Sequence, residues 1–159
     1  MSDFSHLNKE GKTVMVDIGE KTPTRRSATA RTVMGLPPEV INAFSDGDIQ
    51  TKKGSVVGTA ILAGIMAAKK TSDLIPLCHT LALEDCQINI SFSKENELVI
   101  ECTASTTSKT GVEMEALVGA TIAALTVYDM CKALSHDIVI KETKLISKSG
   151  GKKDFHIAQ

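Results

Sequence analysis

The sequence predicts an α+β fold. Two long stretches, residues 55–68 and 110–134, are apolar on nearly every helical face and predict buried helices. A hairpin is expected where apolar and polar residues alternate over 86–92 and 98–104. The expected elements follow in the order β, α, α, β, β, α, β, which indicates a ferredoxin-like antiparallel sheet with two long helices packed on one face.

The N-terminal part is expected to be irregular. Residues 1–13 are polar and aperiodic and predict a flexible N-terminal arm, which leaves residues 14–159 as a single domain. A short extended run is expected at 14–18, followed by a strand at 25–34 that is rich in Thr and Ala.

The next segment contains a short helix and the first long one. Proline at 37 and 38 favours a short helix that runs to about Phe44, and a polar loop follows at 48–54. Ser55 is a plausible N-cap for the first long helix. Pro76 prevents simple helix continuation, so Cys78 and His79 are expected on a loop.

The last third holds the second long helix, expected from about Thr110 to about Leu134. A strand is expected over 138–146, a basic loop over 148–153 and a final extended segment over 155–157.

The two helices carry more apolar surface than one small sheet needs, and their small residues permit close helix–helix approach. We therefore expect an oligomer packed partly through them. The small residues concerned are Gly58, Ala60, Ala63, Gly64, Gly119, Ala120, Ala123 and Ala124.

Composition disfavours several classes of partner. The 159 residues include 18 basic and 19 acidic side chains, a formal net charge of −1, so no global field attracts nucleic acid or membranes. Only four Phe, one Tyr and no Trp are available for stacking on RNA bases. No signal-like segment occurs, and no apolar run approaches the roughly 20 residues of a membrane span, which predicts a cytoplasmic protein. The four cysteines lack metal-site spacing and are expected to be reduced thiols.

Two charges near the end of the second long helix are candidates for chemistry. Asp129 and Lys132 share a helical stripe with Val118, Ile122 and Leu125, a face expected to be buried. Buried charges need a partner or a catalytic role. An ordinary ion pair at spacing i, i+3 explains them equally well.

The start of the same helix and the loop histidine are also ambiguous. Glu113 follows Thr110 at the spacing of a capping box, and Glu115 also suits a helix N-terminus, so both carboxylates have a structural explanation. Their alternative role is to contact a ligand or move protons. His79 is suited to proton transfer near neutral pH, although a lone loop histidine is more often a surface residue.

Two glycine-containing basic loops could bind phosphate. They comprise residues 53–55 and 148–152, and each alone is better explained as a solvated lysine loop. Walker, dinucleotide-binding and nucleophile-elbow patterns are absent, as is a histidine cluster, so we expect no cofactor and no metal.

Five motif blocks together resemble the molybdenum cofactor biosynthesis protein C family, the cyclic pyranopterin monophosphate synthases. The resemblance covers nearly the whole chain, including the segment 15–17. Thr80 departs from the expected proline after the histidine and could alter that loop. The blocks are Lys53-Gly54, Asp73-Leu-Ile-Pro-Leu-Cys-His79, Lys109-Thr-Gly-Val-Glu-Met-Glu-Ala-Leu117, Ala124-Leu-Thr-Val-Tyr-Asp-Met-Cys-Lys-Ala133 and Lys148-Ser-Gly-Gly-Lys152.

The resemblance implies a lyase-type synthase in molybdenum cofactor (molybdopterin) biosynthesis. Its substrate would be (8S)-3',8-cyclo-7,8-dihydroguanosine 5'-triphosphate, which is rearranged by acid–base steps to cyclic pyranopterin monophosphate with release of diphosphate. It also implies a homohexamer, a trimer of dimers with sites at the dimer interface.

The resemblance also implies roles for single residues. The catalytic residues would be Asp129, Lys132, Lys53, His79 and Glu113. Substrate would be bound by Leu77, Cys78, His79, Met114, Glu115, Lys148, Arg26 and Asp17, and Arg25 would be a further candidate for the triphosphate. The alternative hypothesis is a non-catalytic ferredoxin-like module that binds a nucleotide, and an RNA-binding module is third. The order of proton transfers, the separate roles of Lys53 and Lys132, the subunit supplying each contact and any magnesium on the triphosphate stay open.

Overall fold

The structure is a computed structural model that describes residues 6–8 and 10–157. The predicted flexible arm therefore lies partly outside the described residues. Within it, Leu7 and Thr13 form an isolated antiparallel bridge. The extended run expected at 14–18 belongs to no strand. One of its backbone carbonyls, that of Val16, is instead bound by the side chain of His79.

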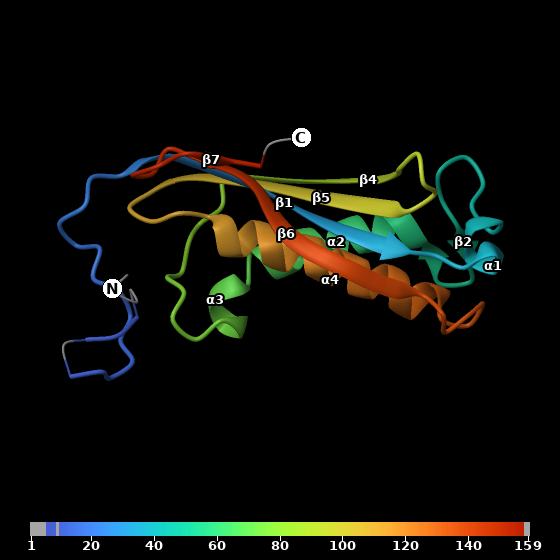
Figure 1. Cartoon of the computed structure of the whole chain (residues 1–159), viewed down its shortest axis with the longest axis horizontal. Coiled ribbons are helices and arrows are strands. Elements are labelled where there is room, and N and C mark those ends of the chain that lie inside the picture. The colour runs from blue at the N-terminus through green and yellow to red at the C-terminus, as the bar shows by residue number, and fades with distance from the viewer. Residues whose placement is uncertain (1–5, 9, 158–159) are drawn as a thin grey trace.

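The described residues form a five-stranded antiparallel sheet in the order β4-β5-β1-β6-β7, with β7 a two-residue strand at its edge. The four long strands have the order of a ferredoxin-like sheet, so the predicted α+β class is confirmed (Figure 1). The strands are β1 (Thr24–Gly35), β4 (Asp85–Phe92), β5 (Leu98–Ser108), β6 (Val139–Ser149) and β7 (Phe155–His156).

Both long helices, α2 (Val56–Ala68) and α4 (Glu113–Cys131), pack on one face of this sheet (Figure 1). Alternate side chains of β1 and β5 point toward them, because successive residues of a strand face opposite sides. The buried side chains on this face of the two strands are Ala28, Ala30, Thr32, Met34, Leu98, Ile100, Cys102 and Ala104.

The two long helices cross where each has a glycine. A Cβ atom added to Gly64 would lie 2.7 Å from the carbonyl oxygen of Gly119, and one added to Gly119 would lie 2.6 Å from Sγ of Cys102. Gly64, Gly119 and the buried alanines Ala60 and Ala123 therefore serve packing within the chain. Packing within one chain is enough to explain these small residues, without contact with a second subunit.

The crossing predicts a specific stability effect. Gly119→Ala should lower the free energy of unfolding by about 1–3 kcal/mol, because its methyl group would overlap the Cys102 sulfur. In a Cys102→Ala background the nearest remaining atom lies 3.4 Å away, so the same change should cost much less. Urea unfolding of the four proteins measures this coupling. An equal cost in both backgrounds would contradict the packing argument.

The orientation of α4 differs from the sequence prediction. The stripe with Val118, Ile122, Leu125, Asp129 and Lys132 was expected to be buried, but Leu125, Asp129 and Lys132 are exposed. The buried face consists mainly of small residues, since only these fit against α2 and the sheet. Because α4 is apolar nearly all round, periodicity did not distinguish its two faces. The buried face comprises Glu115, Ala116, Gly119, Ala120, Ala123, Ala124, Val127 and Cys131.

Several short elements also differ from prediction. The short helix α1 (Pro38–Ile41) ends before Phe44, and hydrogen-bonded turns cover the residues between. The loop expected at 48–54 contains a two-stranded ribbon, β2 (Gln50–Thr51) and β3 (Gly54–Ser55). A one-turn helix, α3 (Thr71–Leu74), precedes Pro76. The predicted loop position of Cys78 and His79 is confirmed.

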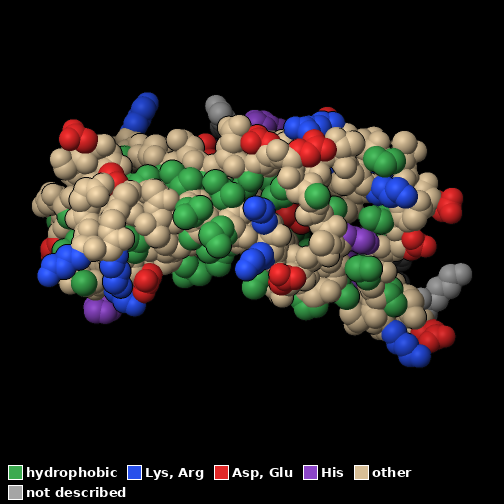
Figure 2. Space-filling model, turned by 180° about the vertical axis from the view of Figure 1, so that it is seen from behind, with side chains coloured by type: hydrophobic (Ala, Val, Ile, Leu, Met, Phe, Trp, Pro, Cys, Tyr) green, Lys and Arg blue, Asp and Glu red, His purple; other side chains and the backbone are tan. Residues whose placement is uncertain are grey.

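The outward faces of α2 and α4 carry large apolar side chains. Leu62 is 59% exposed, Met66 51% and Leu125 47%. A hydrophobic band follows this side of the molecule, with charged side chains toward both ends (Figure 2). Each helix thus places small residues inward and large apolar residues outward, whereas an amphipathic surface helix has a polar outward face.

In length and composition, α4 could cross a membrane, which differs from the expectation that no apolar run approaches a span. It is the one such helix among the described residues. Its packing against α2, β1, β5 and β6 makes it a core helix of this domain.

Candidate functional site

The predicted site residues lie in two clusters at opposite ends of α4. Glu113 begins the helix and Asp129 lies near its end, sixteen residues later. At 1.5 Å per residue they are about 24 Å apart along the axis. One small substrate cannot contact both clusters of the same chain.

The C-terminal cluster contains Asp129, Lys132 and Lys53. Nζ of Lys132 donates to Oδ1 of Asp129 over 2.6 Å. This hydrogen bond and charge, together with the charge of Lys53, hold the pKa of Asp129 below its usual value, and the same contact raises the pKa of Lys132. The ion pair expected from sequence is therefore present. Exposed ion pairs of this kind contribute little to the free energy of unfolding. Stability therefore does not explain why Asp129 and Lys132 lie beside Lys53.

Lys53 reaches this cluster from the turn of the β2–β3 ribbon. Its backbone N–H donates to Oγ1 of Thr51, which itself donates to the carbonyl oxygen of Gly54, each over 3.0 Å. Gly54 has φ +106°, a conformation that favours glycine, so the Lys53-Gly54 pair has a clear backbone requirement. The predicted N-cap is confirmed, since Oγ of Ser55 accepts from the N–H of Gly58.

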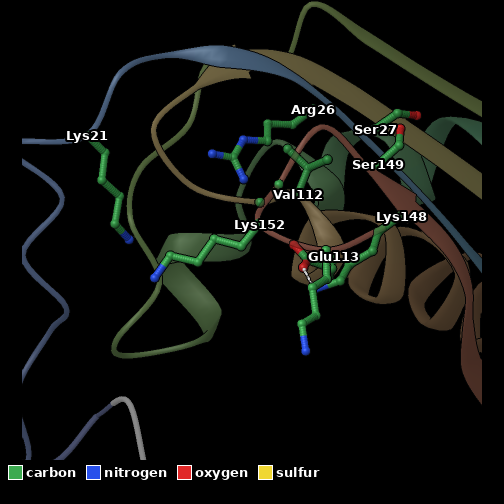
Figure 3. Close-up of a pocket in the computed structure, with 11 residues that line it drawn as sticks. Lys21, Arg26, Ser27, Val112, Glu113, Lys148, Ser149 and Lys152 are labelled. Carbon is green, nitrogen blue, oxygen red and sulfur yellow. Dashed lines mark hydrogen bonds and ion pairs between the residues drawn. The ribbon is translucent and has the colours of Figure 1, made fainter. Parts of the chain in front are cut away.

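The N-terminal end of α4 borders a basic cavity of about 530 Å³. Nζ of Lys148 donates to Oε1 of Glu113 over 2.8 Å, and Figure 3 shows this pair beside the cavity, with Arg26, Lys21 and Lys152 extending around the open space. The residues lining the cavity are Lys21, Arg26, Ser27, Gly111, Val112, Glu113, Lys148, Ser149, Gly151, Lys152 and Lys153.

Basic side chains surround Glu113, the one acidic residue that lines this cavity among the described residues. Burial disfavours the ionised form of Glu113, but its bond to Lys148 and the charges of Lys148 and Arg26 outweigh burial and lower its pKa. Among the described residues, Nε of Arg26 is buried without a hydrogen-bond partner. The guanidinium of Arg26 itself borders the cavity, which makes it a candidate to bind an anion there through its terminal nitrogens.

The predicted capping box is wrong. The N-cap of α4 is Val112, and no side chain caps the helix. Thr110 is held through its carbonyl oxygen, which accepts from Oγ of Ser108. Glu113 turns instead to Lys148, a residue of β6 that lies 35 positions away in sequence.

A second, smaller cavity of about 290 Å³ adjoins the first, with which it shares Gly111 and Glu113. It contains five of the predicted substrate contacts together. Its lining residues are His6, Leu77, Cys78, His79, Leu81, Thr110, Gly111, Glu113, Met114 and Glu115.

Two acidic groups of this smaller cavity favour their neutral forms. Glu115 is only 4% exposed, and burial followed by repulsion from Glu113 raises its pKa. Burial, and then the charge of Glu115, raises the pKa of the Cys78 thiol. Two adjacent carboxyl groups, Glu113 and Glu115, thus have pKa values shifted in opposite directions. Such a pair suits an acid and a base acting together.

The N-terminal segment crosses near both cavities. The Nε2 atom of His79 lies 2.7 Å from the carbonyl oxygen of Val16. Asp17, by contrast, lines neither cavity, and its Oδ1 accepts from the N–H of Gly19 over 2.8 Å. Lys21 was not predicted as a site residue, because a single lysine beside a proline turn carries no distinguishing pattern.

Glu115 predicts a characteristic pH dependence. The pKa of Glu115 is higher in the folded protein than in the unfolded chain. At pH values between these two pKa values, the folded state keeps the proton that the unfolded chain has lost. The free energy of unfolding therefore falls as pH rises from the lower pKa to the higher one. Glu115→Gln should therefore be more stable than the unsubstituted protein above neutral pH and similar to it in acid. Urea unfolding across pH measures this, with Glu20→Gln, at an exposed position, as the control. A Glu115→Gln protein that is less stable above neutral pH would contradict it.

Taken together, these features define an α+β protein with a basic cavity and adjoining acid–base groups. Comparison with known proteins identifies it further. The sequence matches the MoaC family over residues 15–151, and the chain belongs to that family. The resemblance inferred from the motif blocks is thus confirmed.

Curated relatives cover almost the whole chain. A protein of Xanthomonas axonopodis pv. citri (strain 306), named cyclic pyranopterin monophosphate synthase, is 48% identical over 156 residues, which are 98% of this chain and 94% of that protein. A protein of Brevibacillus brevis with the same name is 47% identical over 96% of this chain and 95% of its own length. Molybdenum cofactor biosynthesis protein 1 of Dictyostelium discoideum is 48% identical over 95% of this chain, but the chain spans only 27% of that longer protein.

Proposed function

We propose that this protein is a cyclic pyranopterin monophosphate synthase of molybdenum cofactor biosynthesis. It would convert the cyclised dihydro-GTP to cyclic pyranopterin monophosphate and diphosphate without a cofactor of its own. Family membership and the names of relatives of nearly equal length support the activity. The single structural observation that supports it best is the basic cavity of Lys21, Arg26, Lys148 and Lys152 beside the Glu113–Glu115 pair.

We further propose that each complete site is shared between two chains. One chain would supply the cavities at the start of α4, and a neighbour would supply the cluster at its end. The support is the separation of about 24 Å between Glu113 and Asp129, which is too large for one substrate. The exposed apolar side chains Leu62, Met66 and Leu125 provide a surface on which chains could associate. The family resemblance adds that the oligomer is a hexamer built from dimers, in the cytoplasm.

Within such a site the chemistry follows from the charges. Arg26 and Lys148 would hold the triphosphate, and Lys53 or Lys132 would stabilise negative charge that develops at phosphate. Glu115, in its neutral form, would donate a proton, and Glu113 and Asp129 would accept protons. Leu77, Cys78, His79 and Met114 would line the substrate, and Asp17 would join from the N-terminal segment.

A direct assay tests the activity. The purified protein, mixed with the cyclised substrate, should release diphosphate together with a product that oxidises to a fluorescent pterin. Saturable nucleotide binding without product by folded protein would overturn the proposal and favour the non-catalytic module.

A further inference from the structure

The N-terminal segment is held against the site at two points. Residues 14–21, here named the strap, form no regular secondary structure. The carbonyl oxygen of Val16 lies 2.7 Å from Nε2 of His79, and the carbonyl oxygen of Gly19 accepts from Nζ of Lys109 over 2.6 Å. His79 and Lys109 both lie outside the strap, on segments that border the smaller cavity.

The first of these contacts has a fixed direction. A carbonyl oxygen can only accept a hydrogen bond, so Nε2 of His79 must carry a hydrogen. In a neutral imidazole only one ring nitrogen is protonated, and Nδ1 is then the free acceptor. Within the described part of the chain, Nδ1 of His79 has no hydrogen-bond partner, and the side chain borders the smaller cavity.

We infer that the Val16 carbonyl fixes His79 in the Nε2–H tautomer, so that Nδ1 is a further proton acceptor of the site beside the carboxylates. The proton would move from the substrate to Nδ1, and the electron pair of the broken bond would stay on the substrate. The resulting imidazolium keeps its Nε2–H bond to Val16, now as a stronger charge-assisted bond. Val16 thus acts as a positioning residue through its backbone.

The strap connects this effect to the basic cavity. It continues to Lys21, which lines that cavity. A docked strap would therefore orient His79 and bring a cation to the anion site at the same time. The proton transfer rests on the proposed function, whereas the tautomer and the docking of the strap do not depend on it.

Nuclear magnetic resonance tests the tautomer directly. Full-length protein labelled with ¹⁵N-histidine should show His79 as a single Nε2–H tautomer in long-range ¹H–¹⁵N correlations, with His79→Gln used to assign the signal. In the double variant Val16→Gly and Lys109→Met, which loosens both tethers, His79 should populate both tautomers. The control Lys12→Met removes only an exposed charge that pairs with Glu10, and should leave the tautomer unchanged. An Nδ1–H tautomer in the unsubstituted protein, or an unaltered double variant, would overturn the inference.

A second measurement tests docking without turnover. A glutamine at position 79 can place its amide nitrogen near the position of Nε2, whereas asparagine is too short to reach Val16. His79→Gln should therefore resist tryptic cleavage after Lys21 as the unsubstituted protein does, and His79→Asn should be cleaved several times faster. Equal cleavage of the two variants would show that the ring contact does not hold the strap.

The activity measurement then connects docking to catalysis. The double variant should lose about tenfold in kcat, since a misdirected ring forfeits part of the contribution of a general base. A change confined to KM would overturn the catalytic part of the inference. No turnover in the unsubstituted protein would reject the proposed function, while the resonance and proteolysis results would still decide the tautomer and the docking.

Discussion

Lys132→Ala and Lys148→Ala chains, each inactive alone, are expected to regain activity when they are combined in one oligomer. Each variant alone should lose about 10²–10⁴ in turnover, because acid–base or charge-stabilising groups contribute that much. The two residues lie at opposite ends of α4, so a mixed pair would form one intact site and one doubly defective site. Random mixing should then restore about a quarter of the full activity, and purified mixed pairs should have about half of it.

Co-expression of the two variants with different affinity tags, followed by purification through both, isolates the mixed oligomers for assay. The control combines Lys132→Ala with Asp129→Ala, which alter the same end of the helix and should give no recovery. Absence of recovery for the first combination, with folded mixed oligomers present, would contradict the shared site.

Arg26→Ala should produce the second large effect, a loss of about 100-fold in affinity for a triphosphate. The guanidinium of Arg26 borders the basic cavity, and a charge-assisted bond to an anion contributes about 1.5–3 kcal/mol. Arg26→Lys keeps the charge but not the planar guanidinium and should recover only part of the affinity. Calorimetry with inorganic triphosphate at two salt concentrations measures both changes.

Arg25 was also expected to bind the triphosphate, but it does not line the basic cavity, so Arg25→Ala is the matched control for this experiment. Its guanidinium donates to Glu84 and, over 2.9 Å, to Oγ of Ser105, so it is already engaged within the sheet. Affinity for triphosphate should therefore change little. An equal loss in the Arg25 and Arg26 variants would indicate a general effect of positive charge and would contradict the specific role of Arg26.

The sheet and the two long helices could be predicted because their patterns are local. The alternation at 86–92 and 98–104 requires only the period of a strand, and Ser55 is recognisable as a cap beside its helix. Predictions failed where distant residues decide. Lys148 of β6 binds Glu113, which therefore does not cap the helix as expected. The face of α4 with small residues is buried, so the stripe that was expected to be buried faces outward instead.

The same limit applies to the candidate site. The motif blocks named most of its residues, and the structure brings Cys78, His79 and Glu115 together in one cavity. Which blocks meet could not be inferred from their order in sequence, because only the folded chain brings the loop of Cys78 and His79 to the start of α4. Val16 could not be recognised either, since it contributes a backbone oxygen that any residue possesses. The catalytic roles stay predictions.

The length of α4 has a consequence for the kinetics. If its two ends belong to different sites, a chain on its own holds no complete centre, and catalysis begins only when chains meet. At concentrations far below the dissociation constant of the pair, the rate would grow with the square of the protein concentration, and only above it in simple proportion. The amount of protein in a cell would then set the activity of each molecule as well as the number of molecules.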